Sequence, residues 1–181
     1  MSSSIQRRKG LTLRELIIFA MLGALMFCSD LLLDALPNIH LLGLFISSFT
    51  LVYGVKALFP IYVYVGLSAV SAILYGGILW WVPYTYVWTV LWGLVMLLPA
   101  RLPKRAAFLL AHLLTTLHGL AFGTLYAPVQ ALLFGLDFRG MLAWIAAGLA
   151  FDLVHAVGNF VFGFFIPPLT ALLERLTYGK G

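Results

Sequence analysis

The stretch LRELIIFAMLGALMFCSDLLLDAL at residues 13–36 decides the class of fold. It is the first of six apolar segments, each about as long as the ~17–25 residues that a helix needs to cross a ~30 Å hydrocarbon layer, and some are longer. The six segments are Leu13–Leu36, Ile39–Val55, Ala57–Ile78, Val82–Leu98, Ala106–Phe134 and Met141–Leu173. They predict an all-α integral membrane protein with six transmembrane helices in one bundle and no soluble domain.

Lysine and arginine residues flank these segments on alternate sides. Ten of the eleven cations precede segment one, follow segment two, follow segment four or follow segment six. In chain order they are Arg7, Arg8, Lys9, Arg14, Lys56, Arg101, Lys104, Arg105, Arg175 and Lys180. Only Arg139 lies in a connection on the other side. Because loops rich in lysine and arginine stay in the cytoplasm, we expect both termini to be cytoplasmic in a multi-pass protein of the cell membrane.

The composition excludes a water-soluble globular protein. Hydrophobic residues make up 63% of the chain, charged residues only 9%, and the mean hydropathy is +1.06. The net charge of +5 would suggest nucleic acid in a soluble protein, but here the cations flank membrane segments, so membrane lipid is the expected partner. The single cysteine, Cys28, rules out a disulfide framework and a thiolate metal cluster.

Turn-forming residues separate the segments, and the chain contains no linker or internal repeat. Pro37-Asn38, Gly76-Gly77 and the stretch 99–103 (PARLP) stand between consecutive segments. We therefore expect residues 1–10 to be a disordered cytoplasmic N-terminus and residues 11–181 to form one six-helix domain.

Polar side chains at membrane depth are costly and mark functional sites. At the ~1.5 Å rise of a helix, Asp152 lies roughly 15 Å below the outer end of segment six. Asp152, His155 and Asn159 are spaced i, i+3 and i+7, which places them on one inward face. The alternative is a packing role, in which Asp152 pairs with His155, or His155 and Asn159 bond to segment five, where His118 lies at comparable depth.

Three further helices bring polar or aromatic groups to the outer half of the membrane. Asp30, Trp88 and Tyr126 lie within roughly 8–12 Å of the outer boundary. Tyr126 and Gln130 flank Pro128, which removes a backbone donor and can open the helix.

The aromatic residues near the outer boundary have two interpretations. Trp88 is suited to stack on a flat heterocycle, although packing is the alternative. Tyr84 lies with Trp80 and Trp81 at the outer connection, where an aromatic belt competes with ligand contact.

The sequence contains no motif for catalysis, and we expect no enzymatic activity, no cofactor and no metal. No phosphate-binding loop, His-Glu-x-x-His pair or Gly-x-Ser-x-Gly turn is present. Two alternatives remain open. Asp30 and Asp152 are the candidates for an intramembrane carboxylate pair that hydrolyses peptides, and the chain could also be a small self-assembling membrane protein or channel.

The first segment also carries a resemblance to a known family. LTLRELIIFAMLGAL at residues 11–25 resembles the first helix of the substrate-binding S components of energy-coupling factor (ECF) vitamin transporters. Ala20 and Ala24 occupy the small-x-x-x-small pair by which that helix packs on the transmembrane coupling subunit, with Gly23 beside them. Residues 37–43 (PNIHLLG) and 80–84 (WWVPY) are similar to members of this family as well.

The resemblance implies the substrate-specificity subunit of an ABC-type importer. Such a subunit captures a small vitamin or vitamin precursor from the outer face and associates with a coupling subunit and two ATPase subunits, which drive uptake. It also implies a pocket in the outer half and toppling of the protein in the membrane during release. The family has no universal substrate residues, so the candidates Trp88, Tyr126, Gln130, Asp152, His155 and Tyr84 rest on depth and helix face.

Overall fold

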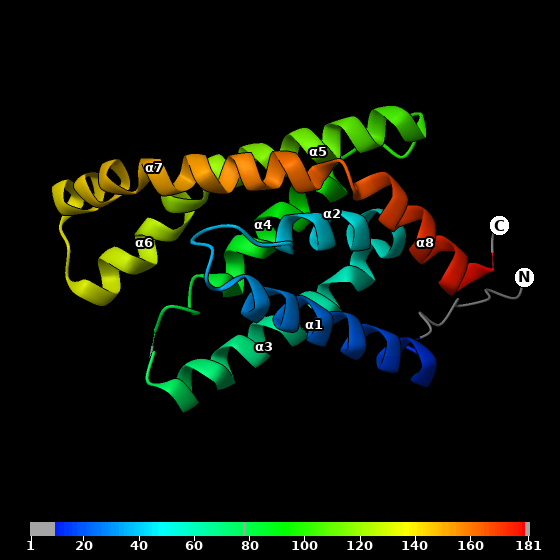
Figure 1. Ribbon diagram of the computed structural model, residues 1–181, viewed down its shortest axis with the longest axis horizontal. Helices are drawn as coiled ribbons and strands as arrows, with labels where there is room; N and C mark the ends of the chain where they lie inside the picture. The colour runs from blue at the N-terminus through cyan, green and yellow to red at the C-terminus, as the bar shows by residue number, and fades with distance from the viewer. Residues whose placement is uncertain (1–9, 78, 180–181) are drawn as a thin grey trace, which may run out of the picture.

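The computed structural model describes residues 10–77 and 79–179, which are helical with no strand among them (Figure 1). Arg7, Arg8, Lys9, Lys180 and the predicted segment end at Ile78 lie outside these described residues. The elements are α1 (Leu13–Leu33), α2 (Leu42–Tyr53), the 3-10 turn η1 (Gly54–Ala57), α3 (Leu58–Tyr75), α4 (Tyr84–Met96), α5 (Lys104–Leu120), α6 (Phe122–Phe134), α7 (Phe138–Gly163) and α8 (Ile166–Tyr178). The predicted all-helical class is confirmed.

Three helical stretches are long and apolar enough to cross a membrane: Leu13–Leu33, Leu42–Tyr75 and Phe138–Gly163. The pair α5 and α6, bent by 41° at a one-residue break, makes a fourth. α4 is apolar but shorter. These helices are those of a membrane protein. They differ from the predicted segments in that only the 3-10 turn η1, with no non-helical break, joins segments two and three.

Prolines and glycines set most of these boundaries. Pro37 ends the first segment early, because α1 gives way to turns after Leu33. Gly54, at φ 57° and ψ −125°, ends α2 in a backbone conformation that favours glycine. The sixth segment is divided into α7 and α8, and Pro167 and Pro168 occupy the first turn of α8, where a missing N–H costs nothing.

Neighbouring helices alternate in direction along the first half of the chain. The ring of Phe19, near the start of α1, lies 5.0 Å from that of Tyr53 at the end of α2 and 6.2 Å from that of Phe59 at the start of α3. Lys56 in η1 forms a 2.5 Å ion pair with Glu15 in the first turn of α1. The start of α1, the end of α2 and the start of α3 therefore meet, so α2 runs opposite to α1 and α3.

The same end of the molecule holds the cation-bearing connections, apart from that of Arg139 at the start of α7. Lys104 at the start of α5 pairs with Glu174 of α8 at 3.1 Å, and Tyr53 of α2 bonds to Thr177 of α8 at 3.0 Å. In Figure 1 the start of α1 and the end of α8 lie at this end, and the α6–α7 connection lies at the other. We call the first the cationic end and the second the opposite end.

The packing leaves apolar side chains on the outside. Leu32 of α1, Ile73 of α3 and Leu132 of α6 are 83%, 72% and 82% exposed. The buried side chains include many polar ones, among them Ser47, Ser48, Ser68 and Thr115. A water-soluble protein has the reverse arrangement, so these outer surfaces are suited to lipid.

Polar bonds join α2, α5 and α7 in the interior. Asn159 Nδ2 donates to the carbonyl oxygen of Thr115 at 2.9 Å, and the hydroxyls of Ser47 and Thr115 lie 2.6 Å apart. A side chain at Gly43 would place its Cβ 2.7 Å from Asn159 Oδ1, so the glycine is required for this contact. Asn159 is thus occupied in helix packing, which is the structural alternative that the sequence left open.

Candidate functional site

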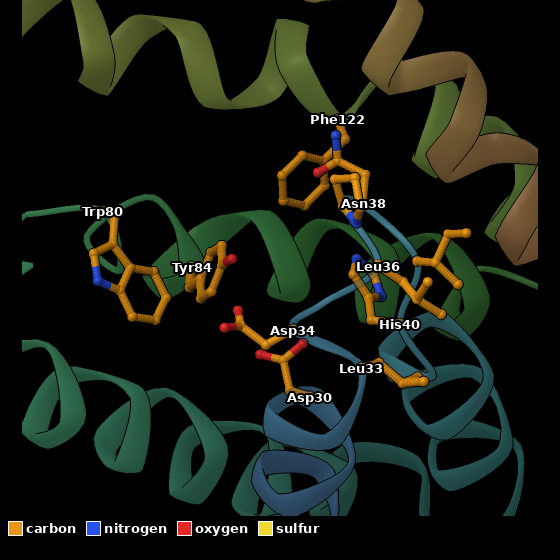
Figure 2. A pocket seen from close by; sticks show the side chains of 11 residues that line it. Asp30, Leu33, Asp34, Leu36, Asn38, His40, Trp80, Tyr84 and Phe122 are labelled. Carbon is orange, nitrogen blue, oxygen red and sulfur yellow. The ribbon is translucent and has the colours of Figure 1, made fainter.

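Two adjoining cavities lie toward the opposite end of the molecule, under the connections α1–α2 and α3–α4. The first measures about 260 Å³ and is lined by Asp30, Leu33, Asp34, Leu36, Pro37, Asn38, Ile39, His40, Trp80, Tyr84 and Phe122 (Figure 2). The second measures about 280 Å³ and is lined by Asn38, Tyr84, Phe122, Gly123, Tyr126, Trp144, Gly148, Phe151 and Asp152. Asn38, Tyr84 and Phe122 belong to both, so they form the partition between two compartments of one site.

The α1–α2 connection forms one wall of the first cavity. Its turn is closed by backbone bonds from Leu36 N to Leu33 O at 2.7 Å and from Ile39 N to Leu36 O at 3.1 Å. Asn38 has a φ of 58°, and among the described residues it is the one non-glycine residue with a positive φ. Asparagine tolerates this left-handed conformation because its short amide can bond locally. The turn thereby presents Asn38 to both cavities.

Each cavity has a carboxyl group held by one hydrogen bond. Asp30 Oδ2 accepts from the hydroxyl of Tyr64 at 2.8 Å. Asp152 Oδ1 accepts from the backbone N–H of Gly123 at 2.8 Å. A Cβ at Gly123 would lie 2.5 Å from Asp152 Oδ2, so only glycine lets α6 approach the carboxyl group this closely. Asp34 is exposed at the first cavity.

Aromatic rings pack behind the cavities. Trp88 is fully buried, with its ring centroid 5.5 Å from that of Tyr84, 5.3 Å from that of Phe122 and 5.7 Å from that of His118. His155 lies 4.7 Å from Phe122. These contacts place the rings at the separations that aromatic pairs prefer, so they hold the partition between the cavities in place.

Several buried polar atoms around this ring cluster lack a hydrogen-bond partner. They are His40 Nδ1, Trp88 Nε1, His118 Nδ1, Asp152 Oδ2 and His155 Nε2. Native interiors contain few such atoms, and each requires an explanation such as water or a ligand. Their concentration beside two cavities indicates a place for a polar guest.

His40 lies in the α1–α2 connection, outside the spanning helices, with its ring 4.3 Å from that of His155 and 5.5 Å from that of Trp88. Burial, and secondarily the nearby His118, lowers the pKa of His40 to about 4. Since the folded state binds the proton less readily than the unfolded state, the contribution of neutral His40 to stability is complete above pH ~6.5 and is lost as the pH falls toward 4.

We expect acidification from pH 7 to pH 4 to destabilise the protein by about 3 kcal/mol through His40. Thermal unfolding of the wild type and of His40→Phe, measured across this range, checks the expectation. The variant keeps a ring but cannot titrate, so its melting temperature should depend less on pH. Identical pH slopes for the two proteins would rule out His40 as the titrating group.

The structure brings most of the predicted binding residues to the site. Tyr84 lines both cavities, and Tyr126 and Asp152 line the second. Trp88 and His155 lie directly behind, in ring contact with Phe122. Tyr126 stacks on Trp144 at 5.9 Å and bonds through its hydroxyl to the carbonyl oxygen of Trp80.

Gln130 is placed differently from the other predicted residues. It lies one helical turn beyond Tyr126 on α6, is half-buried, and lines neither cavity. Tyr126 and Gln130 were predicted to act together because they flank Pro128, but only Tyr126 lines the second cavity.

Sequence reasoning missed several lining residues. They are Asp34, Asn38, His40, Phe122 and Trp144, none of which was among the predicted binding residues. The signal for the first three was present, because the stretch 34–40 (DALPNIH) crowds polar groups between two apolar segments.

The two aspartates of the hydrolase alternative are not brought together. Asp30 lines the first cavity and Asp152 the second, on opposite sides of the partition. A dyad that shares a proton needs its carboxyl groups about 3 Å apart. The cavities therefore give this alternative no support.

Of the three residues predicted to form the coupling face of α1, Ala20 and Ala24 are accessible and Gly23 is buried. Ala20 is exposed and Ala24 half-exposed. Gly23 is buried against α3, where a Cβ would lie 2.5 Å from Val63 Cβ and 2.7 Å from the carbonyl oxygen of Pro60. Gly23 thus serves packing inside the chain, and the two alanines are the residues that a partner can reach.

The described residues contain no group of three or more histidine, cysteine, aspartate or glutamate side chains that could hold a metal ion. The chain matches no protein-family model, no curated protein and no solved structure. The geometry of the site and the pattern of charges are therefore the observations that indicate its function.

Proposed function

We propose that this protein is the substrate-specificity subunit of an ECF-type importer, resident in the plasma membrane. It crosses the membrane six times, with α5–α6 and α7–α8 as broken spans and both termini in the cytoplasm. It captures a small vitamin or vitamin precursor from the outer face. A transmembrane coupling subunit and two ATPase subunits then drive release inward.

The observation that carries this proposal is a divided aromatic and polar chamber at the end opposite the cations. Apart from that of Arg139, the cation-bearing connections gather at one end, which the positive-inside rule assigns to the cytoplasm. The two cavities lie toward the other end, and pockets of this kind, with aromatic walls and a few convergent polar groups, are typical of small-molecule sites.

Binding needs no chemistry beyond shape and hydrogen bonds. A flat ligand can pack against Tyr84, Phe122 and Tyr126, while Asp152 fixes its polar edge. Of the unpartnered atoms, His40 Nδ1 and Asp152 Oδ2 belong to residues that line the cavities, and they supply further bonding positions. Because buried polar atoms without partners cost ~1–3 kcal/mol each, a ligand that satisfies them gains specificity as well as affinity.

Filling the second cavity should abolish ligand capture without unfolding the protein. Gly148 lines this cavity, and a Cβ there meets no atom within 4 Å. We therefore expect Gly148→Leu to occupy the ligand space at little cost in stability. Native mass spectrometry of gently purified protein should find a small molecule on the wild type and none on the variant.

Gly66→Leu is the matched control, since Gly66 on α3 also has open space around it but lines neither cavity. This variant should retain the molecule. If the wild type carries no small molecule under any gentle purification, or if Gly148→Leu retains it fully, the capture function proposed here is wrong.

A further inference from the structure

Three carboxyl groups at the site have no positively charged partner in the described part of the chain. Asp30 and Asp34 line the first cavity and Asp152 lines the second. The ion pairs among residues 10–77 and 79–179 join Lys56 to Glu15 and Lys104 to Glu174, both at the cationic end. The lysines thus neutralise the acids at one end, and no described cation neutralises those at the site.

The buried acceptors of the site also lack donors. Asp152 is only 5% exposed, and its Oδ2 has no partner although Oδ1 accepts from Gly123. His118 is 2% exposed, and its Nε2–H donates to the carbonyl oxygen of Val87 at 3.0 Å. Its Nδ1 is therefore an acceptor, and it too has no partner. Asp152 lines the second cavity, so a guest there that donates a hydrogen bond would satisfy Oδ2. His118 lies behind the cavity lining, in contact with Trp88 and Phe122.

Aromatic rings complete the surroundings of these carboxyl groups. Figure 2 shows the carboxyl groups of Asp30 and Asp34 close together at the first cavity, on the side of Trp80 and Tyr84. The rings of Trp80 and Tyr84 meet edge to face at 5.5 Å. The faces of such rings attract cations that approach within ~6 Å. Carboxylates and the faces of aromatic rings both attract positive charge.

We propose that the site selects an organic cation, a ligand that joins a flat aromatic or heteroaromatic body to a positively charged nitrogen. The charge lies between Asp30, Asp34 and the rings of the first cavity. The flat body packs on the rings of Tyr84 and Phe122, which line both cavities, and donates a hydrogen bond to Asp152 in the second. This inference rests on the proposed capture function and narrows its substrate class.

Tryptophan fluorescence tests the charge preference, because Trp80 and Trp144 line the two cavities. The probes are N-methylquinolinium, the neutral 4-methylquinoline and the anion quinoline-4-carboxylate, which share one bicyclic shape. The protein is kept in an uncharged maltoside detergent, so that no lipid headgroup competes as a second source of organic cation. We expect N-methylquinolinium to bind about ten-fold more tightly than 4-methylquinoline.

Removing the carboxylates should erase that preference. Asp30→Asn/Asp34→Asn is expected to bind the cation and the neutral probe equally. Asparagine at position 30 can still accept the hydrogen bond from Tyr64. If the double variant does not fold, Asp34→Asn is tested alone, because Asp34 is exposed. This single variant should lose about half of the preference on a logarithmic scale. The matched control is Asp137→Asn, which removes a charge from the helix cap of α7, where asparagine also caps. It should keep the full preference.

Equal binding of the three probes, tighter binding of the carboxylate, or no quenching by the cation at millimolar concentration overturns the cation assignment. A neutral or anionic molecule found by native mass spectrometry on the wild type overturns it too, while leaving capture intact. A wild type that retains nothing in that measurement and responds to none of the probes contradicts capture itself.

Discussion

Gly23→Leu is expected to destabilise the protein by about 3 kcal/mol or more. A Cβ at Gly23 would lie 2.5 Å from Val63 Cβ and 2.7 Å from the carbonyl oxygen of Pro60, both on α3. The backbone oxygen cannot rotate away, so α1 and α3 must separate. Thermal unfolding followed by size-exclusion chromatography in detergent should record the loss as a sharply lower melting temperature.

Ala20→Leu is the control on the same helix. Ala20 is exposed, so the added methyl groups extend outward and should change the melting temperature little. If the two variants melt alike, then α1 does not pack on α3 through Gly23, and the arrangement of these two helices is wrong.

Under the proposed function, Ala20→Trp should abolish coupled uptake while leaving ligand capture intact, and Ala24→Trp should act in the same way. Small residues let two helix backbones approach closely in lipid, and a tryptophan at this position would hold the coupling subunit away. Ala20 and Ala24 are accessible on the surface of α1, whereas Gly23 is not. The measurement is accumulation of the captured molecule by cells that contain the whole transporter, beside binding by the purified chain.

A tryptophan on another lipid-facing helix provides the comparison. Ala146 on α7 is exposed and has the same four-residue spacing to Ala150. Ala146→Trp should therefore transport normally if the coupling face is specific to α1. Loss of binding together with unchanged assembly in Ala20→Trp would show that this face belongs to the ligand site instead.

Much of the fold follows from the sequence, because in lipid a long apolar run must satisfy its own backbone hydrogen bonds as a helix. The run at residues 13–36 became α1 with only its end shifted, since Pro37 stops the helix. Only some of the breaks were predicted. The break predicted at Lys56 lies in the 3-10 turn between α2 and α3, whereas those between α5 and α6 and between α7 and α8 fall inside single predicted segments.

The candidate site was only partly predictable. Tyr84, Tyr126 and Asp152 could be chosen from depth and helix face, and they line the cavities. Gln130 satisfied the same criteria and lines neither cavity. The criteria fix a position along a helix but not the rotation of that helix against its neighbours, which decides what a side chain reaches.

The amino-acid sequence alone determined that the helices face lipid and that the cations flank the apolar segments on alternate sides. Hydropathy and charge act directly through the bilayer and do not depend on which helices are neighbours. Only the tertiary structure decided which carboxyl groups share a cavity. It placed Asp30 with Asp34, set Asp152 apart behind Tyr84 and Phe122, and turned Gly23 inward while Ala20 stayed outside. The physical reason is close packing, since each of these outcomes depends on contacts between helices that are distant in the chain.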